Sequence, residues 1–290
     1  MAPLQSCVHA SRDYGTRGIT SKVSHTAAVT SVERNVLRLT TDGSENAIDR
    51  LAAESPVELR LGSTPIAVLM RTPGLEQELL RGFALTEGIV LDPREIGSME
   101  QVGPDRWALV PALGVEIDPE QFRRNLYSTS SCGVCGKASI DAVRITARTL
   151  PSGPVVTRST LLNMGLRLRQ SQPTFDDTGG LHAAGLFEPT GRLLASAEDI
   201  GRHNAVDKVI GSVAPYRWPV GETVLVVSGR VSFEVAQKAA VAGIPMVAGV
   251  SAASTLAVEL ADELELTVIG FLRDEGCVVY SGAHRIARGE

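Results

Sequence analysis

The sequence predicts a three-layer α/β core with parallel strands in its C-terminal half, preceded by a smaller α+β domain. Continuous apolar runs over residues 223–227, 245–250 and 266–272 have the length of buried strands. Two helix-like stretches, 233–242 and 255–264, lie between these runs. Strands that are apolar throughout and that alternate with helices are typical of a parallel sheet covered on both faces.

Composition divides the chain into four parts. Residues 1–28 are rich in Ser, Thr, Arg and Gly without periodicity, and we expect a flexible tail. Residues 29–127 mix short strand and helix patterns and form the predicted α+β domain. Residues 128–137 are nearly all small or polar, which indicates an exposed mobile loop. Residues 138–290 carry the α/β core.

Shorter patterns predict the remaining elements. Leu75, Leu79 and Phe83 recur at helical spacing, and Pro189 and Gly191 mark a hairpin turn between two strands. The predicted helices cover residues 74–88, 138–148 and 159–169. The predicted strands cover residues 56–61, 65–70, 106–109, 115–117, 181–187, 192–197 and 278–280.

Composition and charge disfavour several classes of protein. The formal net charge of -5 argues against a nucleic-acid binder that neutralises phosphates. The N-terminus has no apolar run behind a positive start, so we expect no signal peptide. Residues 239–258 carry no charge, but Gly243, Pro245 and Gly249 interrupt them, which favours a buried core over a membrane span. The few scattered cysteines fit no disulfide framework, so we expect reduced thiols in a cytoplasmic protein.

The cysteine pair Cys132 and Cys135 is the strongest chemical signal. It lies in the segment SSCGVCGK, where glycines leave the backbone free and Lys137, Arg123 and Arg124 bring positive charge. Cys-x-x-Cys spacing commonly lowers the pKa of one thiol, and an exposed thiolate accepts sulfur as a persulfide or enters disulfide exchange. The alternatives are half of a structural zinc site, which needs two more ligands, and a pair of inert cysteines. Reactive thiols are favoured because the sequence has no second close pair.

The segment EDIGRHNAVDKVIG allows two interpretations. His203 and Asp207 are four residues apart and share one face of a helix, and Asn204 with Asp207 resembles a capping box. In the first interpretation a helix starts here, with Arg202, Asp207 and Lys208 on a solvated charged face. In the second, Arg202 and Lys208 bind phosphate and His203 acts on a proton. The local pattern favours the first.

Two junctions between a predicted strand and the next helix, residues 228–230 and 251–255, are candidate anion sites. Free amides and the helix dipole favour anions there, and open α/β sheets bind ligands beyond the carboxyl ends of their strands. Ser232 and Ser254 are equally suited to capping their helices. No P-loop or Gly-x-Gly-x-x-Gly pattern is present, so nucleotide hydrolysis and a Rossmann site have no support. His182 fits a core role and a functional role equally well.

Together these segments resemble one family, FdhD, the formate dehydrogenase accessory sulfurtransferases. The resemblance follows the family's order over residues 30–286, and the combination of motifs is far more specific than any one of them. The matching segments are ESPVELRLGSTPIAVLMRTPG, GFALTEGIV, SSCGVCGK, TGGLHAA, EDIGRHNAVDKVIG, VVSGRVSFE, GVSAASTLAVELA and GFLRDEGCVVYSG.

The resemblance implies an activity, partners and a fold. Family members carry sulfur from a cysteine desulfurase to the molybdenum bis-molybdopterin guanine dinucleotide cofactor, the sulfur acceptor, before it enters formate dehydrogenase. The implied fold of residues 138–290 is similar to that of cytidine deaminases, the implied assembly is a homodimer, and no catalytic metal is implied. Carried over to this chain, Cys132 holds the persulfide and Cys135 is its partner. The implied cofactor-binding loop consists of Phe271, Leu272, Arg273, Asp274, Glu275 and Gly276.

That loop departs from the family pattern at Asp274 and Glu275, where many relatives carry a second basic residue. Two carboxylates near a pyrophosphate weaken its binding unless they point away from it. We therefore expect the loop as a whole to bind the cofactor, while its individual contacts stay open.

The similarity to deaminases does not extend to their chemistry. A zinc deaminase needs a His with a Glu two residues on and a downstream Pro-Cys-x-x-Cys. Here His182 is followed by Ala183 and Ala184, and the cysteine pair lies upstream. Two rival functions stay open, a thiol–disulfide oxidoreductase and a cofactor-binding chaperone that transfers no sulfur.

Overall fold

The computed structural model describes residues 28–122, 150 and 153–287. The predicted tail up to residue 27, the predicted loop 128–137 with Cys132 and Cys135, and the predicted helix over 138–148 lie outside the described residues.

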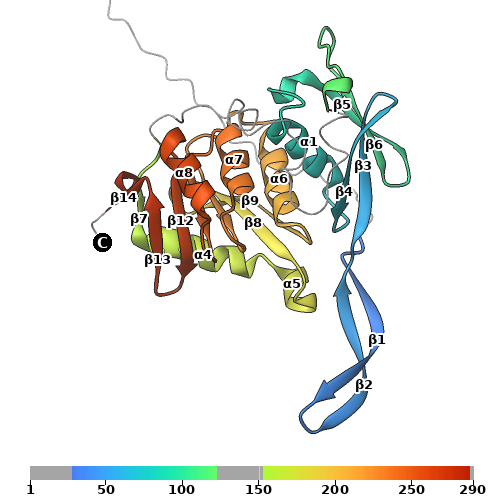
Figure 1. The fold of residues 1–290 in the computed structure, drawn as a ribbon, viewed down its shortest axis with the longest axis vertical. Coiled ribbons are helices and arrows are strands. Elements are labelled where there is room, and N and C mark those ends of the chain that lie inside the picture. The colour runs from blue at the N-terminus through green and yellow to red at the C-terminus, as the bar shows by residue number, and fades with distance from the viewer. Residues whose placement is uncertain (1–27, 123–149, 151–152, 288–290) are drawn as a thin grey trace, which may run out of the picture.

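The described residues form a large sheet, a smaller sheet, a hairpin and the helices around them (Figure 1). The helices are α1 Glu76–Thr86, α4 Arg158–Gln170, α5 Pro173–Thr178, α6 Arg202–Val213, α7 Phe233–Val241 and α8 Thr255–Leu264, with short turns η1 Pro93–Glu95 and η2 Ala283–Arg285. The strands are β1 Ser31–Thr40, β2 Gly43–Ala52, β3 Ser55–Leu61, β4 Thr64–Arg71, β5 Ile96–Gly103, β6 Arg106–Pro111, β7 Val156–Thr157, β8 His182–Phe187, β9 Leu193–Asp199, β10 Val224–Val227, β11 Met246–Gly249, β12 Thr267–Arg273, β13 Gly276–Ser281 and β14 Ile286–Ala287.

The large sheet has the strand order β13-β12-β11-β10-β8-β9. Its central strands β10, β11 and β12 run parallel, as the apolar runs predict. The hairpin of β8 and β9 and the final strand β13 are also confirmed, and both pair antiparallel with the parallel strands. The carboxyl ends of β10, β11 and β12 therefore meet at one edge of a mixed sheet.

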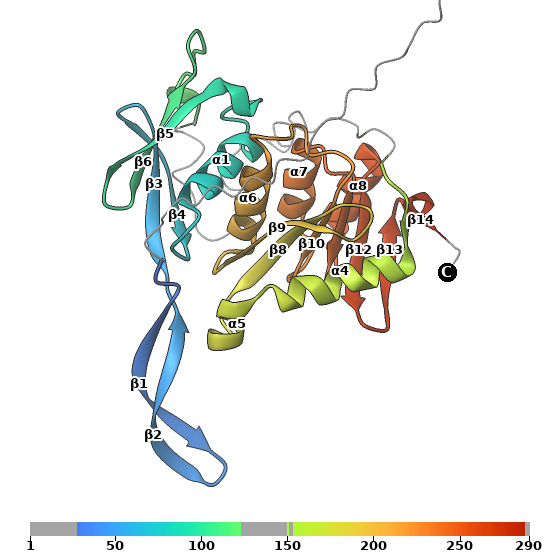
Figure 2. The same cartoon turned by 180° about the vertical axis from the view of Figure 1, so that it is seen from behind.

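Helices lie on both faces of this sheet. Alternate residues of each strand point to opposite sides, so Leu225 and Val247 pack against α6, α7 and α8, while Val226 and Met246 pack against α4. In Figure 1 α6, α7 and α8 lie side by side, and Figure 2 shows α4 crossing the opposite face. The mixed α/β class with parallel strands is thus confirmed, and the likeness to cytidine deaminases stays a prediction.

The uncharged stretch 239–258 divides as predicted into the end of α7, the strand β11 and the start of α8. Within the described residues, no helix has the length and apolar content needed to cross a bilayer.

The smaller sheet has the order β4-β3-β6-β5 and packs one face on α1. The strand pair β3–β4, the helix α1 and the strand β6 confirm three predictions. The strand expected over 115–117 is wrong, because the chain turns at Ala112–Gly114, where Gly114 has φ +81°, and continues without ladder pairing. The strand β5 is present where none was predicted, since IGSMEQVG lacks a clean alternation.

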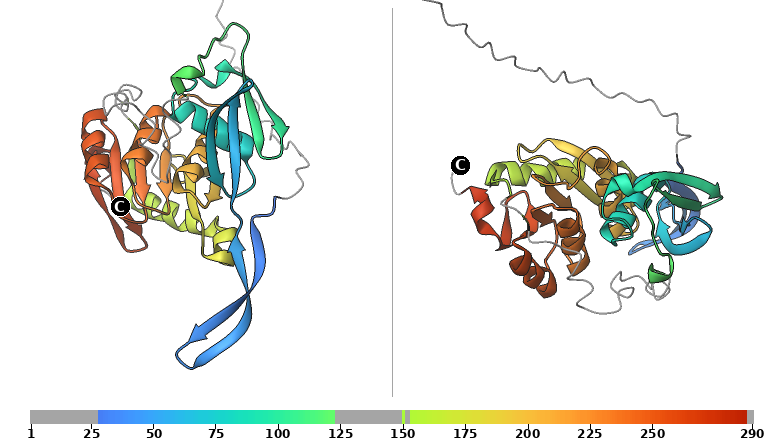
Figure 3. Two further views of the ribbon diagram at one scale, coloured as in Figure 1. Left: turned by 45° about the vertical axis from the view of Figure 1, so that its right-hand side comes forward. Right: turned by 90° about the horizontal axis from the view of Figure 1, so that it is seen from above.

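A long hairpin of β1 and β2 extends away from the smaller sheet (Figures 1 and 3). Its residues are almost all exposed, and Leu37, Leu39 and Ile48 are among its exposed apolar side chains. Arg50 at its base donates to Asp177 of the α5 helix over 2.8 Å, which ties the hairpin to the large domain. This hairpin was not among the predicted elements.

Helices α1 and α6 join the smaller sheet to the large sheet through a close backbone contact. A Cβ atom at Gly82 would lie 1.9 Å from the carbonyl oxygen of Asp207, and one at Gly211 would lie 1.9 Å from that of Glu78. No side chain fits at such distances, so both helices approach each other only because these positions are glycines.

Two buried ion-pair clusters reinforce this interface and correct the first interpretation of α6. Asp207 and Lys208 do not form a solvated face, because both are buried. The Lys208 ammonium lies 2.7 Å from Asp199 and donates to the carbonyl of Thr72, and Asp207 pairs with Lys238 over 3.0 Å. A charge without solvent needs a partner, and these helices supply partners from distant parts of the chain.

The capping box expected from Asn204 and Asp207 is also wrong. The helix α6 is capped at Gly201, and the Asn204 amide donates to the carbonyl of Met70 over 2.7 Å and to Asp199 over 2.9 Å. Asn204 therefore ties α6 to β4 and β9 instead of starting the helix.

Candidate functional site

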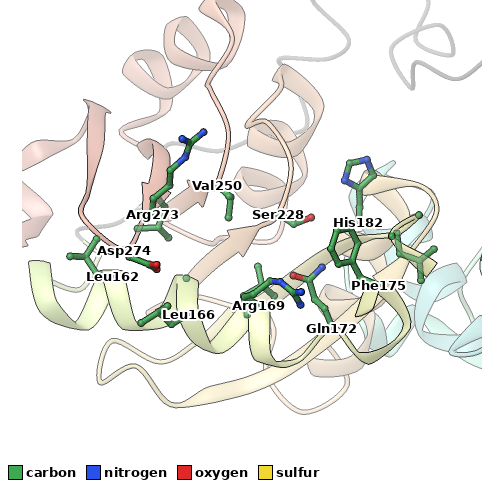
Figure 4. A pocket seen from close by; sticks show the side chains of 16 residues that line it. Leu162, Leu166, Arg169, Gln172, Phe175, His182, Ser228, Val250, Arg273 and Asp274 are labelled. Atoms are coloured by element: carbon green, nitrogen blue, oxygen red, sulfur yellow. The ribbon is translucent and has the colours of Figure 1, made fainter. Parts of the chain in front are cut away.

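A cavity of about 790 Å³ opens at the carboxyl ends of β10, β11 and β12 (Figure 4). The strand ends contribute Ser228, Val250, Leu272, Arg273 and Asp274. The opposite wall comes from α4, α5 and the start of β8, with Leu162, Gly165, Leu166, Leu168, Arg169, Gln172, Phe175, Gly179, Gly180, Leu181 and His182. This is the edge at which open α/β sheets bind ligands.

Part of the predicted cofactor loop lines this cavity. Leu272, Arg273 and Asp274 face it, whereas Phe271, Glu275 and Gly276 are not among its lining residues. Leu272 is buried against α4 and anchors the loop. Phe271 is 40% exposed with φ 52°, and the guanidinium of Arg273 lies 5.9 Å from the centre of its ring. A large residue with positive φ is uncommon outside functional or strained segments.

The two strand–helix junctions, residues 228–230 and 251–255, are hydrogen-bonded to each other beside the cavity. The Ser228 hydroxyl accepts from the amide of Ala183 over 2.9 Å, which leaves its own O–H free to donate. The amide of Ser251 donates to the carbonyl of Gly229 over 3.4 Å. Ser254 caps α8 by accepting from the amide of Ala257, as the capping alternative predicts.

Ser232 at the start of α7 makes no such capping bond with its side chain. Its hydroxyl lies 3.4 Å from Nε2 of His203. The amides at the start of α7 therefore receive no help from this hydroxyl, unlike those of α8.

His182 stands at the end of the cavity away from Arg273. A Cβ atom at Gly229 would lie 3.5 Å from Nδ1 of His182 and 3.8 Å from Cδ of Arg202, so the three residues meet at one place. Burial lowers the pKa of His182, and the positive charge of Arg202 lowers it further. The imidazole is therefore neutral near pH 7, and the Nε of Arg202 is buried without a hydrogen-bond partner among the described residues.

The second interpretation of α6, in which Arg202 and Lys208 bind phosphate and His203 acts on a proton, holds for only some of these residues. Lys208 is sealed against Asp199 and cannot contact a ligand, so its assignment to phosphate is wrong. His203 is not free either, because its Nε2 lies 2.7 Å from a carboxylate oxygen of Glu234. Arg202 differs from Lys208 and His203. It lies near the cavity, and its guanidinium has no ion pair with another described residue.

Sequence reasoning missed the wall made by α4 and α5. Arg169 lines the cavity, stacks its guanidinium 5.2 Å from the centre of the Phe175 ring, and pairs with Asp176. Gln172 lies between α4 and α5 and faces the same space. No motif marks these positions, because they reach the site only through the packing of α4 across the sheet.

The described residues contain no group of three or more His, Cys, Asp or Glu side chains that clusters as a metal site would. Cys132 and Cys135 lie outside the described residues, so the zinc alternative for that pair stays open.

The similarity to known proteins covers nearly the whole chain. The model of the FdhD/NarQ family matches residues 52–287. The protein named Sulfur carrier protein FdhD from Streptomyces coelicolor is 47% identical over 267 residues, which cover 88% of this chain and 95% of that relative. The protein of the same name from Mycobacterium tuberculosis is 45% identical over 271 residues, which cover 88% of this chain and 98% of that relative.

A crystal structure supports the fold at lower sequence identity. It is described as that of a formate dehydrogenase accessory protein from Desulfotalea psychrophila, and it superposes with a TM-score of 0.73. The superposition covers 89% of this chain and 100% of that chain at 22% identity.

Proposed function

Since the chain belongs to the FdhD/NarQ family, we propose that it is a sulfur carrier that serves formate dehydrogenase. It takes sulfur from a cysteine desulfurase onto Cys132 and gives it to a molybdenum bis-molybdopterin guanine dinucleotide cofactor. The named relatives support the sulfur-carrier role, and the nearly complete coverage of their length supports carrying it over to this chain. The homodimer and the cytoplasmic location stay predictions.

The observation that carries the acceptor side of this proposal is the cavity at the carboxyl edge. Its volume of about 790 Å³ falls in the range of preformed small-molecule sites. Arg273 and Arg169 offer guanidinium groups to anionic parts of a dinucleotide, and Arg202 stands near the far end beside His182. An apolar wall with a few polar groups suits the flat guanine and pterin rings of the cofactor.

The donor side depends on Cys132. Its thiolate attacks the outer sulfur of the desulfurase persulfide, the sulfur–sulfur bond of the donor breaks, and the donor cysteine leaves as a thiolate. The carrier then holds Cys132 as a persulfide, with no net change in electrons. Lys137 and the Cys-x-x-Cys spacing favour the thiolate form that this attack requires.

Delivery of the outer sulfur as sulfide needs two electrons, and Cys135 is the thiol three residues away that supplies them. The Cys135 thiolate attacks the inner sulfur of the Cys132 persulfide and forms a disulfide with it. Sulfide leaves toward the metal of the bound cofactor, which is the substrate here. A cellular dithiol reductant returns the disulfide to two thiols.

The test is the mass of the protein after incubation with a cysteine desulfurase and free cysteine. The wild type is expected to gain one sulfur atom, and the Cys132→Ala variant none. Cys277→Ala is the matched control, because burial raises the pKa of that thiol and keeps it a poor nucleophile. A Cys132→Ala variant that still loads sulfur and still activates formate dehydrogenase would refute the proposal.

The same experiment separates the rival functions. In a Cys135→Ala variant, which cannot resolve the persulfide, a sulfur carrier would gain one sulfur atom, whereas a thiol–disulfide oxidoreductase would gain none; the wild-type oxidoreductase would also reduce a model disulfide. A cofactor chaperone without sulfur transfer would keep its function when both cysteines are replaced and lose it when Arg273 is replaced.

A further inference from the structure

Gln172 is a buried polar side chain that faces the cavity. It is 3% exposed and lines the cavity at the turn between α4 and α5. Its backbone carbonyl accepts from the amide of Asp176 over 3.1 Å, and no side chain or backbone group of the described residues is bonded to its side-chain amide. Buried amides in folded proteins are normally hydrogen-bonded. The side chain has little exposed surface and borders the cavity, so a molecule bound in the cavity can supply the partner that its amide needs.

The backbone around Gln172 is held firmly. The Glu198 carboxylate accepts from the amide of Thr174 over 3.0 Å and from that of Phe175 over 2.7 Å. The hydroxyl of Ser171, on the other side, donates to the carbonyl of Leu168 over 2.8 Å. These bonds fix the turn from both sides, so the amide position does not have to be organised when a ligand binds.

The surroundings of the amide suit a flat ring system. In Figure 4 Gln172 lies between Arg169 and Phe175, and Leu166 and Val250 also border the cavity. Apolar and aromatic walls cover the faces of a heterocycle, and one amide in such a wall reads an edge. A carboxamide presents an acceptor and a donor side by side.

We propose that Gln172 reads the hydrogen-bonding edge of a pyrimidinone ring that carries an exocyclic amino group. Guanine and pterin share this edge. The amide oxygen accepts from the ring N–H, and the amide nitrogen donates to the ring carbonyl. The inference rests on the proposed function, because the cofactor named there contains both rings, and it adds a specificity-determining residue on α4–α5 to the loop 271–276.

The experiment compares Gln172→Leu with wild type in calorimetric titrations with GDP, neopterin and pyrophosphate. Loss of two hydrogen bonds to a buried edge is expected to weaken GDP or neopterin about 10- to 100-fold. Pyrophosphate, which has no ring, is expected to bind equally to both proteins. The matched control is Gln170→Leu, which changes an exposed glutamine two residues away.

The probes distinguish the two sources of the edge. A loss confined to GDP identifies guanine, and a loss confined to neopterin identifies pterin. Gln172→Glu keeps an acceptor for the ring N–H, so it is expected to weaken the same probe less than Gln172→Leu does. An equal loss in both variants would contradict the proposed pairing.

Two results would overturn the inference while leaving the proposed function standing. One is wild-type affinity of Gln172→Leu for both ring-containing probes. The other is an equal loss of pyrophosphate affinity, which would show general distortion of the cavity. A wild-type protein that binds neither GDP nor neopterin would overturn both the inference and the acceptor side of the proposed function.

Discussion

Replacing Lys238 with methionine tests the buried ion-pair cluster that joins α7 to α6 and to the end of α1. The Lys238 side chain is 5% exposed, and its ammonium lies 3.0 Å from Asp207 and 2.9 Å from Glu87. It also donates to the hydroxyl of Thr86 over 2.9 Å. Burial alone would lower the pKa of Lys238, but the two carboxylates outweigh it and raise that pKa, so the lysine is charged at pH 7.

Lys238→Met leaves two carboxylates facing each other, with Asp207 buried. Removing one partner of a buried pair typically costs about 3–5 kcal/mol, because the remaining charge is uncompensated. We expect a loss of this size in the free energy of unfolding, measured by urea denaturation followed by circular dichroism. The double variant Lys238→Met with Asp207→Asn is expected to recover about 1–3 kcal/mol of it.

The pH dependence gives a second readout of the same variant. Burial already raises the pKa of Asp207, and without the lysine nothing nearby opposes this rise strongly. A carboxyl whose folded pKa exceeds its unfolded value stabilises the fold at low pH and loses that contribution as pH rises. The deficit of Lys238→Met is therefore expected to shrink as the pH falls from about 8 to about 5.

The control for this series is Arg192→Met, which removes an exposed ion pair with Glu188 and should leave the free energy of unfolding unchanged. A loss below about 1 kcal/mol for Lys238→Met, or a double variant no more stable than the single one, would show that the cluster is not a coupled buried pair.

The remaining predictions concern the domain contact and the cavity. Gly211→Ala is expected to lower the free energy of unfolding in urea by about 3 kcal/mol or more, because its Cβ would clash with a backbone carbonyl of α1. The control Gly276→Ala places its Cβ in open space and should be as stable as wild type. Asp274→Asn removes a carboxylate from the cavity wall and should tighten pyrophosphate binding about 2- to 5-fold at low salt. Glu275→Gln changes a residue outside that wall and should leave the binding unchanged. Equal effects of the two variants would contradict the assignment of Asp274 to the wall. Because burial and a nearby arginine lower the pKa of His182, a bound anion should raise it again, so pyrophosphate affinity should increase as the pH falls from about 8 to about 6. His182→Gln should flatten this dependence in the same titration, and an unchanged slope would place the titrating group elsewhere.

Elements that bury a continuous or periodic apolar pattern were predictable from the sequence. The strands β10, β11 and β12 are apolar because helices cover both of their faces, so composition alone reveals them. The hairpin of β1 and β2 was missed for the converse reason. It packs almost none of its residues on a core, so burial imposes no alternation on its side chains.

The candidate site was predictable only where a strand end or a motif marks it. Ser228 and Arg273 follow apolar runs, and the edge of the sheet brings them to one cavity. The burial of Lys208 could not be predicted, because its partner Asp199 and its acceptor Thr72 become neighbours only when α6 packs against distant parts of the chain. Gln172 carries no local signal at all, since its role depends on where α4 crosses the sheet.

These long-range contacts also explain how residues far from the cavity shape it. The buried carboxylate of Asp199 accepts from the amides of Thr72 and Gly201, from Asn204 and from Lys208. It thereby holds together the end of β9, the segment before α1 and the first turn of α6. Arg202 belongs to that turn and lies beside His182, so the contacts of Asp199 also hold the backbone that carries Arg202. In EDIGRHNAVDKVIG, the buried Asp199, Asp207 and Lys208 thus fix the helix, whereas Arg202 lies beside the cavity-lining His182.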